Sequence, residues 1–227
     1  TELQVLDYQQ QQHRIFPLLA ASYCFFFTGT KVLNRLAEIE RKLVHNQHVT
    51  KTEVTDVHAS SSALKSFTTM LAADGIEECR KACGGHGFLM ASGLPELYTM
   101  YLQSPTVEGD NHMLPQQVMK VLLKVVEAVQ SSSDASSSLE NDYANCDSIH
   151  LIEPLQAIFH GKQQACPASS KKDMWNLDLL LKAFGQRAAQ TLGDVAQQLQ
   201  TAMMNKTPQD ARNHCPVGMA RRSKAYS

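Results

Sequence analysis

The chain has 227 residues, with 21 Lys and Arg against 22 Asp and Glu. This length is enough to bury the core of one or two domains, and the near balance of charge excludes a whole-chain attraction to nucleic acid. The six cysteines show no dense pairing pattern, which is typical of free thiols in a reducing compartment rather than of a disulfide framework.

Apolar residues at spacings of three and four predict a first helix from Leu6 to about Lys42. Its longest apolar run, Ile15 to Phe27, is shorter than the roughly 20 residues that cross a bilayer, so we expect a buried helix core and no membrane span. A second helix is predicted from near Thr52, with Glu53 in its first turn, to about Ala82. No N-terminal signal peptide is visible.

After a short helical piece at Leu94 to Tyr101, a third long helix is predicted from near Asp110 to Val129, with Pro115 tolerated near its first turn. The polar stretch Gln130 to Ser138, QSSSDASSS, then predicts a flexible linker and a domain boundary.

Beyond this stretch, helical spacing returns at Ile149 to Phe159 and at Met174 to Met204, and Thr207-Pro208 restarts a helix. No segment has the alternating pattern of a strand. The predicted class is all-α, a bundle of long helices followed by part of a second helical region. The predicted divisions are a helical domain at 1–129, a linker at 130–145 and a partial helical domain at 146–227.

The ends of the sequence suggest a portion of a longer protein. The chain begins with Thr1 rather than Met, and an amphipathic pattern still runs towards Ser227. The last residues, Ala-Tyr-Ser, are not a peroxisomal targeting tripeptide.

Two motifs interrupt the helical pattern. The first, CGGHGF at Cys83 to Phe88, follows a helix and not a strand, so a dinucleotide-binding fingerprint is excluded. Spacing alone favours a glycine C-cap with a tight loop. A metal site from Cys79, Cys83 and His86 is disfavoured, because the paired Cys spacing and a fourth ligand are missing.

The second motif, PTVEGDN at Pro105 to Asn111, places Glu108 beside Gly109. An isolated carboxylate with an apolar neighbour and a glycine is a candidate general base with a raised pKa. The alternative is an acid in the first turn of the third helix, where it complements the helix dipole. Spacing alone favours that alternative.

Taken together, the segments IEECRKACGGHGF, SGLPELY and PTVEGDNHMLPQQVMKVLLK resemble the acyl-CoA oxidases, flavoenzymes related to the acyl-CoA dehydrogenases. Upstream, LDYQQQQHRIFPLLAASYCFFFTG is similar to a family helix with a DYQ-x-QQ-x-x-x-FPLLA pattern. The resemblance covers residues 1 to about 127 well and is looser after about 145.

This resemblance implies a chemistry for both motifs. Glu108 would be the catalytic base that removes the α-proton of an acyl-CoA thioester, and its backbone N–H would bond the thioester carbonyl. Gly109 would leave room for the substrate. FAD would be the cofactor, and the glycine turn would pass close to it.

The residues that the resemblance places at FAD are Tyr8, Gln9, Gln10, Gly84, Gly85, Asp110, Asn111 and His112. The three from the first helix are expected to reach the cofactor of a partner subunit. Lys81, Val107 and His112 depart from the residues usual in the family or its relatives. No metal is implied, and the family's N-terminal helical domain and middle β-domain are not in this chain.

The function implied is oxidation of acyl-CoA to trans-2-enoyl-CoA, with O2 reduced to H2O2, by a peroxisomal homodimer. Two alternatives stay open: an acyl-CoA dehydrogenase with a protein electron acceptor, and a non-catalytic helical remnant. The EGDN sequence, the GGHG turn and the helical region beyond the Ser-rich stretch favour the oxidase. The chain-length preference for the acyl group does not follow from this sequence.

Overall fold

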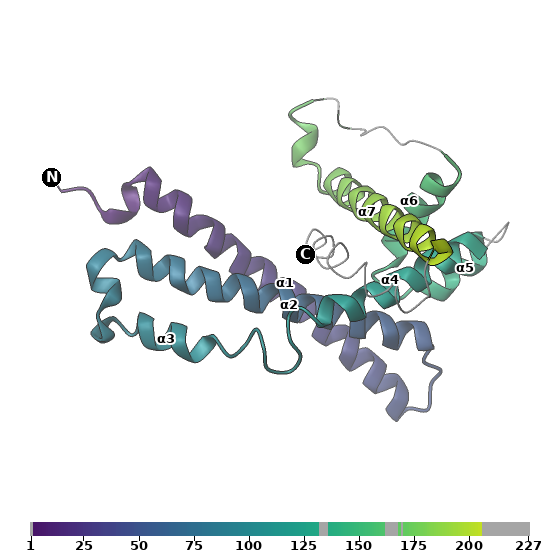
Figure 1. Cartoon of the computed structure of the whole chain (residues 1–227), viewed down its shortest axis with the longest axis horizontal. Helices are drawn as coiled ribbons and strands as arrows, with labels where there is room; N and C mark the ends of the chain where they lie inside the picture. The colour runs from purple at the N-terminus through teal and green to yellow at the C-terminus, as the bar shows by residue number, and fades with distance from the viewer. Residues whose placement is uncertain (1, 132–135, 162–167, 169, 206–227) are drawn as a thin grey trace. The chain divides into compact units, whose positions relative to one another are not determined.

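The computed structural model describes residues 2–131, 136–161, 168 and 170–205, and these residues contain helices and no strand. The predicted all-α class is therefore confirmed. In chain order the elements are η1 (Val5–Asp7), α1 (Gln9–Val44), α2 (Lys51–Ala82), η2 (Gly84–Phe88), η3 (Met90–Ser92), α3 (Leu94–Tyr101), α4 (Leu114–Ser131), α5 (Ser136–Tyr143), α6 (Ile149–Phe159), η4 (Asp173–Trp175) and α7 (Leu177–Asn205), and Figure 1 labels the α-helices.

The chain divides into two compact units: unit 1 comprises Thr1–Glu38 and Ser61–Leu114, and unit 2 comprises Ile39–Ser60 and Pro115–Ser227. In unit 1, α1 and α2 run antiparallel. Arg14 of α1 pairs with Glu78 near the end of α2, at 2.5 Å between Nε and Oε1. Further along α1, the rings of Phe25 and Phe67 meet edge to face with centroids 5.7 Å apart, a favourable aromatic geometry.

Unit 2 contains a continuous apolar core. Its fully buried side chains come from α4, α5, α6 and α7, and α6 packs along α7. The core residues are Met119, Val125, Val126, Val129, Leu139, Ile152, Leu155, Ala189, Leu192, Val195 and Ala196. Apolar side chains at helical spacing on each of these helices produce the core, as the sequence pattern predicts.

The predicted burial of α1 is wrong within this chain. Tyr23, Phe26 and Phe27 are 61%, 67% and 65% exposed, and Phe16 is exposed as well. The reason is that α2 covers only one side of α1, whereas apolar residues also occupy other sides of this helix. By length and composition α1 could cross a membrane, with a mean hydropathy of 1.3 over 18 residues, but helices that pack against protein meet the same test.

Part of the predicted linker is a helix. Helix α4 continues to Ser131, and α5 occupies Ser136–Tyr143, where Leu139 enters the core of unit 2. Residues 132–135 and the predicted helix start at Thr207 lie outside the described residues. Helices α3 and α6 have the predicted bounds, whereas α4 begins at Leu114, four residues later than predicted.

Candidate functional site

Glu108 lies in a closed loop between α3 and α4. The backbone N–H of Asn111 donates to the carbonyl of Pro105 at 3.0 Å and closes the loop. Inside it, Glu108 has a φ of 57° and Gly109 a φ of 110°, both in the region that L-residues rarely adopt. The loop presents Glu108 as an exposed side chain. Because α4 begins six residues further on, Glu108 is not a first-turn acid, and that alternative is wrong.

Gly109 is required at its position by the geometry of the loop. Its φ suits glycine alone, and a Cβ there would lie 2.9 Å from Cδ2 of Leu114. A side chain at this position would therefore strain the backbone and displace Leu114. The Glu-Gly pair is thus a structural unit, in which the glycine permits the turn that exposes the carboxylate.

Polar side chains of α2 hold this loop. Lys65 donates from Nζ to the carbonyl of Gly109 at 2.5 Å and to Oδ1 of Asn111 at 3.0 Å. Asn111 in turn donates from Nδ2 to the carbonyl of Ser66 at 3.0 Å and to Oγ1 of Thr69 at 2.8 Å. The loop is therefore attached to one turn of α2 by several hydrogen bonds.

These contacts change the expectation for Asn111. Its side chain is 2% exposed, and its two amide hydrogens are both donated within unit 1. This geometry favours a positioning role for the side chain over a direct contact with a cofactor. Asp110 accepts a hydrogen bond from the backbone N–H of His112 at 2.7 Å, and the side chain of His112 is exposed.

The glycine turn follows α2 directly and forms η2. Gly84 has a φ of 61°, which favours glycine at the end of a helix. At Gly87, a Cβ would lie 2.0 Å from the carbonyl oxygen of Arg80, so only glycine fits between η2 and the last turn of α2. At Gly85, by contrast, a Cβ would meet no atom within 4 Å. The backbone at Gly85 is thus open to the approach of an external group.

The start of α1 lies beside this turn. Gln11 donates from Nε2 to the carbonyl of Ala82 at 3.0 Å, while its Oε1 is buried without a hydrogen-bond partner. Tyr8, Gln9 and Gln10 are exposed. A buried polar atom without a partner is rare and calls for an explanation. Gln11 therefore joins the candidate residues, although the sequence pattern pointed to its neighbours.

Cys79 lies in the last turn of α2, and Cys83 directly follows the helix. In the part of the chain that the structure describes, no three His, Cys, Asp or Glu side chains converge as metal ligands. Burial, with smaller contributions from Cys83 and Glu78, raises the pKa of the Cys79 thiol. The thiol form is a poor metal ligand.

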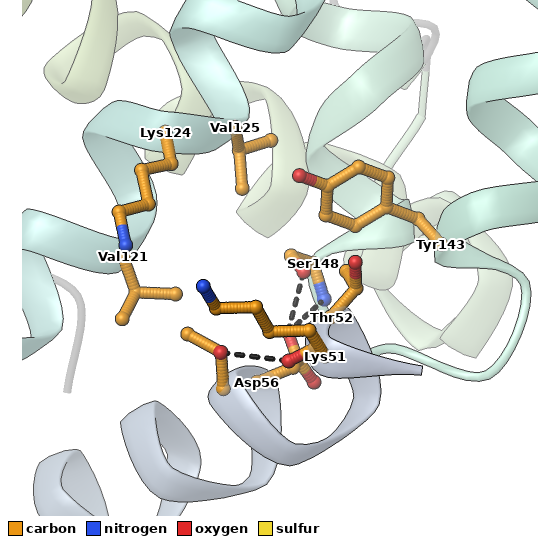
Figure 2. Close-up of a pocket in the computed structure, with 9 residues that line it drawn as sticks. Lys51, Thr52, Asp56, Val121, Lys124, Val125, Tyr143 and Ser148 are labelled. Carbon is orange, nitrogen blue, oxygen red and sulfur yellow. Dashed lines mark hydrogen bonds between the residues drawn. The ribbon is translucent and has the colours of Figure 1, made fainter. Parts of the chain in front are cut away.

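A separate cavity of about 260 Å³ lies within unit 2, and its lining includes none of the predicted site residues. Figure 2 shows the amino groups of Lys51 and Lys124 and the hydroxyl of Tyr143 around it. Its buried carboxylate, Asp56, accepts hydrogen bonds from the backbone N–H groups of Asp147 (2.8 Å) and Ser148 (3.2 Å). Asp56 thus ties α2 to the start of α6, which is a structural task.

Lys65, Ser66 and Thr69 were missed by sequence reasoning, as was Gln11. The available signal was a group of polar side chains at helical spacing, Ser62, Lys65, Ser66 and Thr69, in the middle of an otherwise half-buried helix. Such a group indicates a polar contact on that face of the helix, but its partner about 45 residues away does not follow from spacing.

In unit 1, the helices thus carry an exposed carboxylate on a fixed loop and a glycine turn whose backbone is accessible. The sequence model described as "Acyl-CoA oxidase, C-alpha1 domain" matches residues 1–123. The chain therefore belongs to the acyl-CoA oxidase family.

Named relatives agree with this assignment. Peroxisomal acyl-coenzyme A oxidase 1 of Arabidopsis thaliana is 40% identical over 187 residues, which are 82% of this chain and 26% of the relative. The solved structure of Arabidopsis thaliana acyl-CoA oxidase 1 is similar with a TM-score of 0.79 and 32% identity, over 100% of this chain and 32% of that one.

A further solved structure, acyl-CoA oxidase-1 of Caenorhabditis elegans complexed with FAD and ATP, has a TM-score of 0.78 and 27% identity. It is matched over 100% of this chain and 31% of its own length. The chain thus spans about a third or less of the proteins that it resembles.

Proposed function

We propose that the protein containing this chain is an FAD-dependent acyl-CoA oxidase that converts acyl-CoA to trans-2-enoyl-CoA with O2 as the electron acceptor. The observation that carries the proposal is the exposed Glu108 at the turn of a loop fixed to α2, in a member of this family. The relatives' names support a peroxisomal location.

Glu108 is the general base of this reaction. Its carboxylate takes the α-proton of the thioester, and a carboxylate serves as such a base when it is held within reach of that proton. The fixed backbone of residues 105–111 supplies this placement. Removal of water by the rest of the protein and by the substrate would raise the basicity of the carboxylate, which is exposed in this chain.

FAD, when bound, supplies the acceptor for the hydride from the β-carbon. The residues present fit this cofactor at the glycine turn. The backbone at Gly84 and Gly85 is accessible, no Cβ obstructs it, and the unpartnered Oε1 of Gln11 can accept a hydrogen bond there. Tyr8, Gln9 and Gln10 are exposed beside the same turn, and Asp110 and His112 accompany the catalytic loop.

The exposed apolar residues of α1 support a homodimer. Tyr23, Phe26 and Phe27 are 61%, 67% and 65% exposed and supply surface for a second subunit.

The test is Glu108→Gln in the full-length protein. The variant should keep FAD and bind acyl-CoA, but turnover should fall by about 10²–10⁴-fold, since Gln has nearly the same shape and accepts no proton. Hydrogen peroxide release is measured under air, and flavin bleaching by acyl-CoA is measured without oxygen. Flavin bleaching at the parental rate would show that Glu108 is not the base.

The parental protein distinguishes the alternatives. Flavin bleaching without peroxide formation would replace the oxidase by a dehydrogenase that needs a protein electron acceptor. A protein that binds no FAD and bleaches none would be the non-catalytic remnant.

A further inference from the structure

We propose that Lys65 is a positioning residue that holds the Glu108–Gly109 backbone in its reactive conformation. This inference rests on the proposed function, because it assigns Glu108 as the base. Lys65 lies on α2, 44 residues before Gly109, and its side chain donates a hydrogen bond to Gly109, the residue next to Glu108.

The contacts of Lys65 suit this task. Its ammonium group has three hydrogens, and two of them are accounted for by the carbonyl of Gly109 at 2.5 Å and by Oδ1 of Asn111 at 3.0 Å. Hydrogen bonds from a charged donor are roughly twice as strong as those between neutral groups. Lys65 therefore links Gly109, in the middle of the loop, to Asn111, which closes the loop, and holds both residues against α2.

The conformation that Lys65 holds is one that the backbone does not favour. A left-handed conformation at a residue with a Cβ, here Glu108 with φ 57°, is strained and persists only where its surroundings maintain it. Ser66 and Thr69 secure Asn111, three residues further on. Without Lys65, the carbonyl of Gly109 would lose its donor, the peptide between Gly109 and Asp110 could rotate, and the neighbouring Glu108 would be free to leave this conformation.

Such a rotation would move the carboxylate. A misplacement of about 1 Å at a reacting group can cost about 100-fold in rate. Because a displaced carboxylate affects the proton-transfer step, the loss should fall on kcat rather than on KM.

The experiment uses the full-length holoenzyme with Lys65→Met, Lys65→Arg and, as a matched control, Lys120→Met. Lys120 is an exposed lysine of α4 whose amino group donates to Oε1 of Gln117 on the same helix at 3.4 Å. Two quantities are measured: the amide hydrogen exchange of residues 105–112, and kcat and KM for a saturated acyl-CoA.

For Lys65→Met, we expect exchange in 105–112 to rise at least tenfold and kcat to fall by about 10–100-fold, with KM within about threefold of the parent. Lys65→Arg should show a smaller rise in exchange and a smaller fall in kcat than Lys65→Met, because Arg keeps a charged donor. Lys120→Met should change neither. If the Met variant does not purify, Lys65→Gln, with a shorter neutral side chain, is measured with the same expectations.

Unchanged exchange in 105–112 together with parental kcat in Lys65→Met overturns the proposal. So does a raised KM at parental kcat. The proposed function is judged separately by Glu108→Gln: if that variant loses turnover while Lys65→Met keeps it, the positioning role fails and the base assignment stands. If Glu108→Gln keeps turnover, the proposed function itself fails.

Discussion

Units 1 and 2 bury different kinds of residue. In unit 2, Leu155 and Leu192 are 0% exposed and belong to a continuous apolar core. In the described part of unit 1, the residues below 9% exposure are small or polar, such as Ala73 and Ser62, and the most buried is Asn111. Unit 2 thus has an apolar interior of its own, whereas the described part of unit 1 is held by half-buried side chains such as Phe25 and Phe67 and by the polar contacts of the Glu108 loop.

This difference separates the tasks of the two units. A unit without an apolar interior of its own gains stability when another protein surface packs against it. The exposed apolar residues of α1 can form such a contact. The same unit contains the loop of Glu108 and the glycine turn. The residues proposed to meet cofactor, substrate and partner therefore lie in the unit that has little apolar core of its own.

The largest effect on stability should come from the core of unit 2. Leu192→Ala should cost about 2–5 kcal/mol, because the side chain is fully buried and the change leaves a cavity. Leu177→Ala, at the exposed start of the same helix, should cost within about 0.5 kcal/mol. Urea unfolding measures both, and equal effects would contradict the burial of Leu192 in the apolar core of unit 2.

A smaller, pH-dependent effect is expected at Glu53 in unit 2. A hydrogen bond from Lys42, with further bonds from Thr50 and Asn145, lowers the pKa of Glu53 from 4.5 to about 2. The charged form therefore contributes stability that is present above about pH 4.5 and is lost as the pH falls towards 2. Glu53→Gln should remove at most about 3 kcal/mol at pH 7, and progressively less in acid.

The measurement is the free energy of unfolding at several pH values between 7 and 3, with Glu127→Gln, an exposed carboxyl of α4, as the control. A difference between Glu53→Gln and the parent that stays constant across this range would show that the ion pair with Lys42 is not its source.

The smallest effect on stability should come from the exposed face of α1. Phe26→Ser should change the free energy of unfolding of the monomer by no more than about 0.5 kcal/mol but should weaken self-association, since Phe26 is 67% exposed. Its neighbour Phe25, half-buried against Phe67, should cost more in stability when changed to Ser. Sedimentation measures self-association, and urea unfolding measures the free energy of unfolding of each variant.

Local patterns predicted much of the fold. The three-four spacing and the turn residues located α3 and α6 with their observed ends, and the glycines marked the end of α2 at Ala82. The start of α4 was predicted too early, because Asn111 bonds back to Pro105 and Asp110 accepts the N–H of His112, which prolongs the loop. The catalytic assignment of Glu108 came from family resemblance and stays a proposal.

What the sequence did not predict is long-range or depends on surfaces outside the chain. The bonds from Lys65 to Gly109 and from Gln11 to Ala82 join residues 44 and 71 positions apart, and no spacing rule relates them. The exposure of α1 was missed because an apolar helical pattern indicates burial without indicating whether the covering surface belongs to the same chain.

Helix α2 carries the anchor of the Glu108 loop near its middle and the glycine turn at its end. Between these two points, one inserted or deleted residue would change the length by only about 1.5 Å but would rotate one end against the other by about 100°. The glycine turn would then face another direction relative to the Glu108 loop, even if no side chain around the turn were changed. Substitutions between Thr69 and Ala82 should thus be far better tolerated during divergence than any change in the number of residues.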